Sequence, residues 1–166
     1  MSYTKEEGVE YSKFDQELMT AIDDSKIQVR LNGVSVDNSY NHTTADGEKS
    51  GSLFFGSFEG NVVLGSGENQ KVVATQSIDI TTSINAEKAG IDPAGYTVGH
   101  ELLEGYYGAR DFPGAKSTDQ KAYMSSHLKS LDVLPMKISK PELYSNGMIK
   151  VSINGIAPIT VRPARK

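Results

Sequence analysis

The chain contains no cysteine, so disulfide bonds are excluded and the redox compartment is left unconstrained. Any metal ion would have to be held by histidine, aspartate, glutamate or water. Histidine is itself scarce, because among 166 residues it occurs only at His42, His100 and His127. A site that needs histidine must therefore be built from these three residues.

Long apolar runs are also missing. No stretch approaches the roughly 20 apolar residues of a membrane-spanning helix, so no membrane span is expected. The first residues, MSYTKEEGVEYSKF, are acidic and polar, so we expect no signal peptide and a chain that is cytoplasmic when made. A formal net charge of −4 lacks the basic excess typical of nucleic-acid binding, which makes a nucleic-acid enzyme the least favoured class.

The rest of the composition is that of an ordinary folded protein, with 37% hydrophobic and 23% charged residues. We expect a single domain over residues 1–166, in which residues 1–10 form a loose leader. Turn residues, caps and hydrophobic periodicity then predict the elements. In chain order these are a helix after Ser12, a strand at 27–31, a long loop at 32–51, a strand, turn and strand at 52–65, a strand at 71–80, helices at about 93–107 and 118–131, and strands with turns at 146–147 and 154–155. This order predicts the α+β class.

Two caps set the predicted starts of the later helices. Asp92 and Pro93 suit the N-cap and the first position of the helix at about 93–107. The segment STDQ, residues 117–120, has the pattern of a capping box and predicts the start of the next helix. Three glycines inside the first of these helices, Gly95, Gly99 and Gly105, predict close packing against a neighbouring backbone.

The most informative segment is VGHELLEGYYGA, residues 98–109. On a helix, residues four apart lie on one face, so His100 and Glu104 can bind the same ion. Glu101 lies about 100° around the helix, where it can reach a metal-bound water without being a ligand. The segment resembles the His-Glu-x-x-His motif of zinc hydrolases, with glutamate replacing the second histidine. A carboxylate is an accepted zinc ligand, so the replacement is compatible with a working site.

The third ligand has to come from another element. His127, on the next predicted helix, is our first choice, and His42, in the long loop, is the rival. Tyr123 lies four residues before His127 on the same helix face and can reach into the site. A zinc ion there would lower the pKa of its water to ~7, and Glu101 would take the proton, as in a peptidase or amidase.

A purely structural interpretation stays open. In that case Leu102, Leu103, Tyr106 and Tyr107 form a core face, Glu101 and Glu104 form a solvated face, and His100 is a buried histidine with its bonds satisfied. The protein would then be a non-catalytic binding module with a structural metal or none. The metal content of the purified protein distinguishes these readings.

Several segments together resemble a known family. The matching segments are GSLFFGSFEGNVV, VVATQSIDI, HELLEGYYGA and AYMSSH, within about residues 14–130. They are similar to the metallopeptidase-like toxin domain at the C-terminus of RHS-repeat polymorphic toxins of Bacteroidetes. Ser126 stands where that family commonly has alanine, and this chain carries no RHS repeats. The chain would then be an excised toxin domain, a stand-alone effector or a mobile-element relative.

The resemblance implies a zinc-dependent toxin or effector with His100, Glu104 and His127 as ligands and Glu101 as base. It also implies a cognate immunity protein and secretion by a dedicated, type VI-like system. A zincin-like fold would place a small twisted mixed or antiparallel sheet against the active-site helix and a second helix. An extended peptide or protein substrate would then join an edge strand of the sheet, for which we expect Val72 to Ile80.

Overall fold

The computed structural model describes residues 2–34, 42–43, 49–50, 56–80, 83–84, 95–135, 142–143, 149–151 and 159–161, with side chains for 2–34, 56–80, 83–84 and 95–135. The elements in chain order are α1 (Lys13–Asp23), β1 (Ile27–Val34), β2 (His42–Thr43), β3 (Lys49–Ser50), β4 (Gly56–Leu64), a 3₁₀ turn (Gly67–Asn69), β5 (Lys71–Asp79), α3 (Tyr96–Asp111), α4 (Gln120–Val133), β6 (Glu142–Leu143), β7 (Ile149–Val151) and β8 (Ile159–Val161). This order confirms the α+β class.

The main sheet is small and mixed, with the strand order β1–β5–β4. β5 runs parallel to β1 and antiparallel to β4, so it is paired on both sides. The expectation that Val72 to Ile80 forms a free edge is therefore wrong. The cause is the parallel pairing of β5 with β1, which places β5 between β1 and β4. A local sequence pattern does not predict this strand order.

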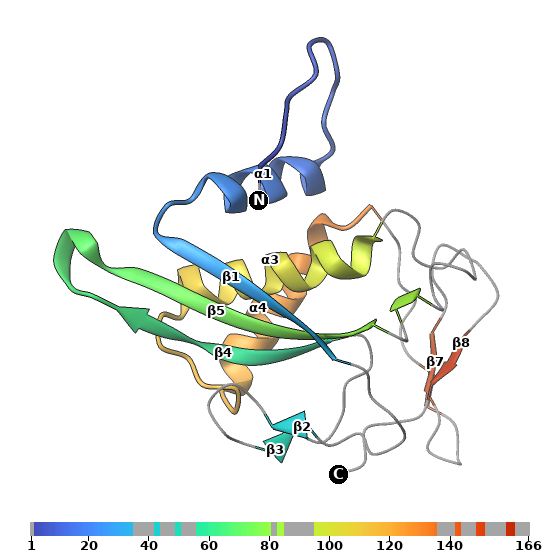
Figure 1. Cartoon of the computed structure of the whole chain (residues 1–166). Helices are drawn as coiled ribbons and strands as arrows, with labels where there is room; N and C mark the ends of the chain where they lie inside the picture. The colour runs from blue at the N-terminus through green and yellow to red at the C-terminus, as the bar shows by residue number, and fades with distance from the viewer. Residues whose placement is uncertain are drawn as a thin grey trace.

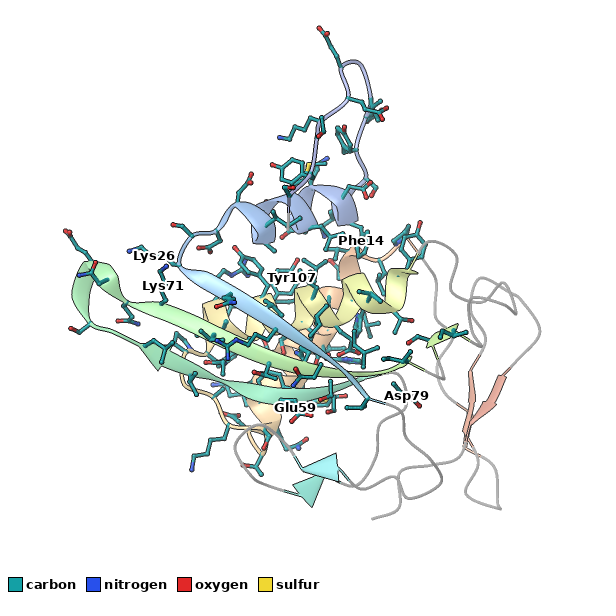
Figure 2. The ribbon with its side chains drawn as sticks, in the orientation of Figure 1. Phe14, Lys26, Glu59, Lys71, Asp79 and Tyr107 are labelled. Carbon is teal, nitrogen blue, oxygen red and sulfur yellow. The ribbon has the colours of Figure 1, made fainter. Side chains whose placement is uncertain are left out.

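Helix α3 lies against one face of this sheet, and α4 and α1 pack against α3 (Figure 1). The N-cap Ser12 forms a reciprocal capping box with Asp15, as expected for the start of α1. Phe14 is the buried residue of α1 and joins Leu103 and Tyr107 of α3 in the main hydrophobic cluster (Figure 2). Helix α3, which carries the HELLEGYYGA motif, therefore lies between the sheet on one side and helices α1 and α4 on the other.

β4 is one strand, whereas the sequence predicts two strands and a turn. Its pairing with β5 shifts register between Phe58 and Asn61, and Gly60 has a φ of 87°. A glycine in this left-handed region admits an extra residue as a bulge, so the strand bends and continues instead of turning back. At the bulge, Gly60 pairs with Lys116.

α3 begins and ends later than the sequence predicts. Asp92 and Pro93 lie outside the described residues, and Gly95, with a φ of 70°, is the N-cap. The helix continues through Gly108 to Asp111. At the C-terminal end of the helix, the Asn61 side chain donates to the carbonyl oxygens of Gly108 in the last turn and of Phe112 at the C-cap, so a tertiary contact satisfies this end.

Two of the three predicted helix glycines are closely packed, but against side chains and not against a neighbouring backbone as expected. A Cβ on Gly105 would come within 2.8 Å of the Val29 side chain, and a Cβ on Gly99 would collide with the ring of Phe14. Nothing lies within 4 Å of such an atom on Gly95. Gly108, which the sequence placed at the helix end, instead packs against Phe58.

α4 exists as predicted but begins at Gln120. Its N-cap is Asp119, whose carboxylate accepts from the amides of Lys121 and Ala122. The expected cap, Ser117, therefore lies outside the helix. Asp and Ser are both strong N-caps, so the local pattern left two starting points and the tertiary packing selected the second.

The remaining segments are short paired strands. Within the predicted loop, β1 continues to Val34 and β2 pairs antiparallel with β3. The C-terminal strands form an antiparallel sheet in the order β6–β7–β8, while the predicted turns at 146–147 and 154–155 lie outside the described residues. No helix in the described ranges combines the length and apolar content needed to cross a bilayer.

Candidate metal centre

The i, i+4 pair of α3 points inward. His100 is 8% exposed and Glu104 is 1% exposed, and Nε2 of His100 lies 3.6 Å from Oε2 of Glu104. Glu101 is also buried, at 5% exposure. The interpretation of Glu101 and Glu104 as a solvated face is therefore wrong, although Leu103, Tyr106 and Tyr107 do lie in the core as that interpretation proposed.

His127 of α4 completes the group. Its Nδ1 lies 2.7 Å from Oε2 of Glu104 and 3.3 Å from Nε2 of His100. The ligand atoms of the three residues all lie within 4.8 Å of one another, so the group could hold a metal ion. The rival ligand His42 lies in β2, and its side chain is outside the part of the chain that the structure describes.

Burial controls the charge of the first histidine. It lowers the pKa of His100 to about 3, with a smaller contribution from the neighbouring His127. His100 is consequently neutral at physiological pH. A neutral imidazole is the form that binds a metal.

Glu101 stands beside the group without being part of it. Its Oε2 is buried and finds no hydrogen-bond partner among the described residues. Its carboxyl group lies so close to the backbone of Gly56, at the start of β4, that a Cβ there would overlap it. Burial, and then the charge of Glu104, raise the pKa of Glu101 well above its ordinary value. The site thus contains a carboxyl group suited to taking up a proton.

Tyr123 also reaches the group. Its ring centroid lies 5.3 Å from that of His127 and 6.5 Å from that of Phe58. Burial raises the pKa of Tyr123 to about 12, and the charges of Glu104 and Glu101 act in the same direction. The phenol therefore keeps its proton at neutral pH and is available as a hydrogen-bond donor.

Two polar residues that the sequence analysis did not single out touch the ligands. The hydroxyl of Ser130 lies 3.0 Å from Nδ1 of His100, and Nε2 of Gln76 donates to Oε1 of Glu104 over 3.5 Å. Both residues are fully buried. For Gln76 a signal existed, because it is the polar member of the inward-facing series Val72, Ala74, Gln76, Ile78 of β5.

Comparison of the chain with protein families, with curated proteins and with solved structures finds no match in any of the three.

Proposed function

We propose that the protein is a zinc-dependent hydrolase of the peptidase or amidase type. The observation that carries the proposal is the convergence of His100, Glu104 and His127 beside the unpartnered carboxyl oxygen of Glu101. A ligand set of two histidines and one glutamate, with a further carboxyl group close by, is the arrangement used by zinc hydrolases.

The donor set and the charge both fit a divalent cation. Two carboxyl groups are buried within a few residues of one another, and the ion pairs of Glu104 in the described ranges are with histidines. Two neutral imidazoles and one carboxylate leave Zn²⁺ with a net positive charge, which suits the burial of a second carboxylate nearby. Zinc bound there would supply a Lewis acid and lower the pKa of a coordinated water to ~7.

Glu101 acts in this proposal as the general base. Burial and the charge of Glu104 raise the pKa of Glu101, and a higher pKa makes its carboxylate a stronger base. Oε2 has no competing partner in the described part of the chain. Glu101 would therefore accept the proton of the attacking water at Oε2 and later give it to the leaving amine.

Tyr123 donates a hydrogen bond to the oxygen on which negative charge develops. The phenol suits this task because it stays protonated and its ring packs directly against the ligand His127. A fixed donor of this kind stabilises the transition state more than the ground state.

The substrate in this proposal is an extended peptide or protein segment. β4 is the terminal strand of the described sheet on the side of Glu101, and its later part is already paired at Gly60. The start of β4, at Gly56, is the part of this strand that lies beside the Glu101 carboxyl group. In the proposed zincin-like arrangement, a peptide adds to this strand and lies across the motif helix, and the position of Gly56 beside Glu101 supports it.

The biological role proposed is that of an interbacterial toxin or effector. It is supported by the resemblance of the HELLEGYYGA helix and the AYMSSH segment to RHS toxin domains. A cognate immunity protein and a dedicated secretion system are part of the same proposal, and toxicity in sensitive cells tests it.

The second candidate is a binding module that uses the metal for structure. The observation in its favour is the deep burial of His100 and Glu104. Against it, three metal-capable residues meet in the described ranges, whereas structural zinc sites are usually closed by four protein ligands.

The deciding experiment measures metal and cleavage together. Protein purified without chelators should contain one zinc ion per chain and should cleave members of a peptide library. A chelator should stop cleavage and added zinc should restore it. Protein that neither contains nor takes up metal contradicts the proposal, and metal-bound protein without any cleavage supports the binding module.

A further inference from the structure

Ser130 is a buried hydroxyl that links the two helices of the site. It lies on α4, three residues after His127, and is 0% exposed. Its Oγ donates to the carbonyl oxygen of His127 over 2.8 Å and lies 3.0 Å from Nδ1 of His100. Helix α4 therefore supplies the metal-capable side chain of His127, and through Ser130 it also contacts Nδ1 of His100 on α3.

The proton of this hydroxyl decides what His100 can do. A serine hydroxyl has one proton to donate, and in Ser130 it goes to the backbone of His127. Oγ can then only accept from Nδ1 of His100. The proton of the neutral imidazole must consequently be on Nδ1, which leaves a lone pair on Nε2.

The contacts on the opposite side of the His100 ring agree with this assignment. Oε2 of Glu104 lies 2.7 Å from Nδ1 of His127, and because a carboxylate only accepts, that nitrogen is the donor. Nδ1 of His127 cannot also accept a proton from Nε2 of His100, which is 3.3 Å away. A proton on Nε2 would find the nearest carboxylate oxygen, Oε2 of Glu104, 3.6 Å away, which is beyond hydrogen-bond distance.

We infer that Ser130 is a positioning residue, which holds His100 in the tautomer and ring orientation that present Nε2 to a metal ion. This inference rests on the proposed metal site. The distal N–H of a metal-binding histidine usually donates to a carboxylate, a backbone carbonyl or water, which raises the basicity of the ligand nitrogen. Here a neutral hydroxyl provides the contact, and it is itself fixed by the turn of α4 that carries His127.

The chain offers a matched control in Ser126. It is also 0% exposed and lies one helical turn before Ser130, and its Oγ lies 2.8 and 3.0 Å from the carbonyl oxygens of Ala122 and Tyr123 in its own helix. Ser126→Ala and Ser130→Ala thus remove the same group from the same helix. Of the two, only Ser130 is bonded to His100.

The first measurement uses metal-free protein labelled with ¹⁵N in histidine. Long-range nitrogen–proton correlations show which ring nitrogen of His100 carries the proton. We expect the Nδ1–H form in the wild type and in Ser126→Ala, and a mixture of tautomers in Ser130→Ala. A wild-type His100 protonated on Nε2 overturns the inference, and this readout decides it even if Ser130→Ala does not fold.

The second measurement is zinc affinity by competition with a chromophoric chelator. Ser130→Ala should weaken binding by about 10- to 100-fold, the usual effect of losing such a contact, while Ser126→Ala should bind as the wild type does. If the two variants bind zinc with equal affinity, the positioning role of Ser130 is wrong, whereas the proposed metal site is unaffected. If the wild-type protein takes up no zinc, the proposed function is wrong, and the contact between Ser130 and His100 has no role in metal binding.

Discussion

Nδ1 of His127 lies 2.7 Å from Oε2 of Glu104, although 23 positions separate the two residues in the chain. The contact joins α4 to α3 at a carboxylate that is 1% exposed. His100 enters the same place from one helical turn before Glu104. These three residues form a candidate metal centre in the interior, and each member can be tested separately.

The histidines should differ sharply in their effect on metal binding. His100→Ala and His127→Ala each remove one of the three convergent groups, so the bound zinc should be lost or held far more weakly in both. His42→Ala, at the rival position in β2, is the control and should leave zinc affinity near that of the wild type. Elemental analysis and chelator competition measure this. If His42→Ala weakens binding as much as His127→Ala does, the ligand assignment is wrong.

Glu101→Gln should separate catalysis from metal binding. The amide keeps the size of the side chain and removes the base, so zinc and fold should be retained. Hydrolysis, and toxicity in sensitive cells, should fall by about 10²- to 10⁴-fold, the contribution typical of a general base. A Glu101→Gln variant that is as active as the wild type contradicts the hydrolase proposal.

Glu104→Gln is the informative companion of that variant. It replaces an anionic ligand by a neutral one, so metal occupancy, thermal stability and activity should fall together. Glu101→Gln should lower activity alone. Parallel losses in both variants would show that Glu101 also holds the metal, against the role proposed for it.

Gly56→Ala should disturb Glu101 from the neighbouring strand. The added Cβ would overlap the Glu101 carboxyl group, which must move. Because displacement of a catalytic group by about 1 Å can cost about 10²-fold in rate, we expect a loss of that order with zinc retained. The control is Gly33→Ala in β1, whose Cβ would meet the flexible end of Ile80 instead. Equal activity of the two variants would argue that Glu101 is free to relocate.

Tyr123→Phe should lower the rate without loss of metal. The ring still packs on His127, but the hydrogen-bond donor is gone, and removal of one such donor typically costs about 10²- to 10³-fold in kcat. Tyr107→Phe makes the same change where the hydroxyl donates to Glu17 of α1, and should affect stability rather than turnover. An undiminished kcat in Tyr123→Phe assigns the residue to packing.

Local patterns were enough for much of this protein. The N-cap at Ser12, the alternation of Ile27, Val29 and Leu31, and the one-turn spacing of His100 and Glu104 each depend on patterns within a few residues. Periodicity of this kind is short-range, so it predicts which elements form and which side chains share a face. It predicted the α+β class and the His100–Glu104 pair of the candidate metal centre.

The tertiary structure decided the rest, because it depends on contacts between residues far apart in the chain. The insertion of β5 between β1 and β4 made Val72 to Ile80 a central strand. The packing of α4 on α3 placed His127 beside Glu104, and brought Ser130 to the back of the His100 ring. The sequence alone determined that His100 and Glu104 share one helix face. That this face is buried, and that a second helix completes it, follows only from how the helices pack.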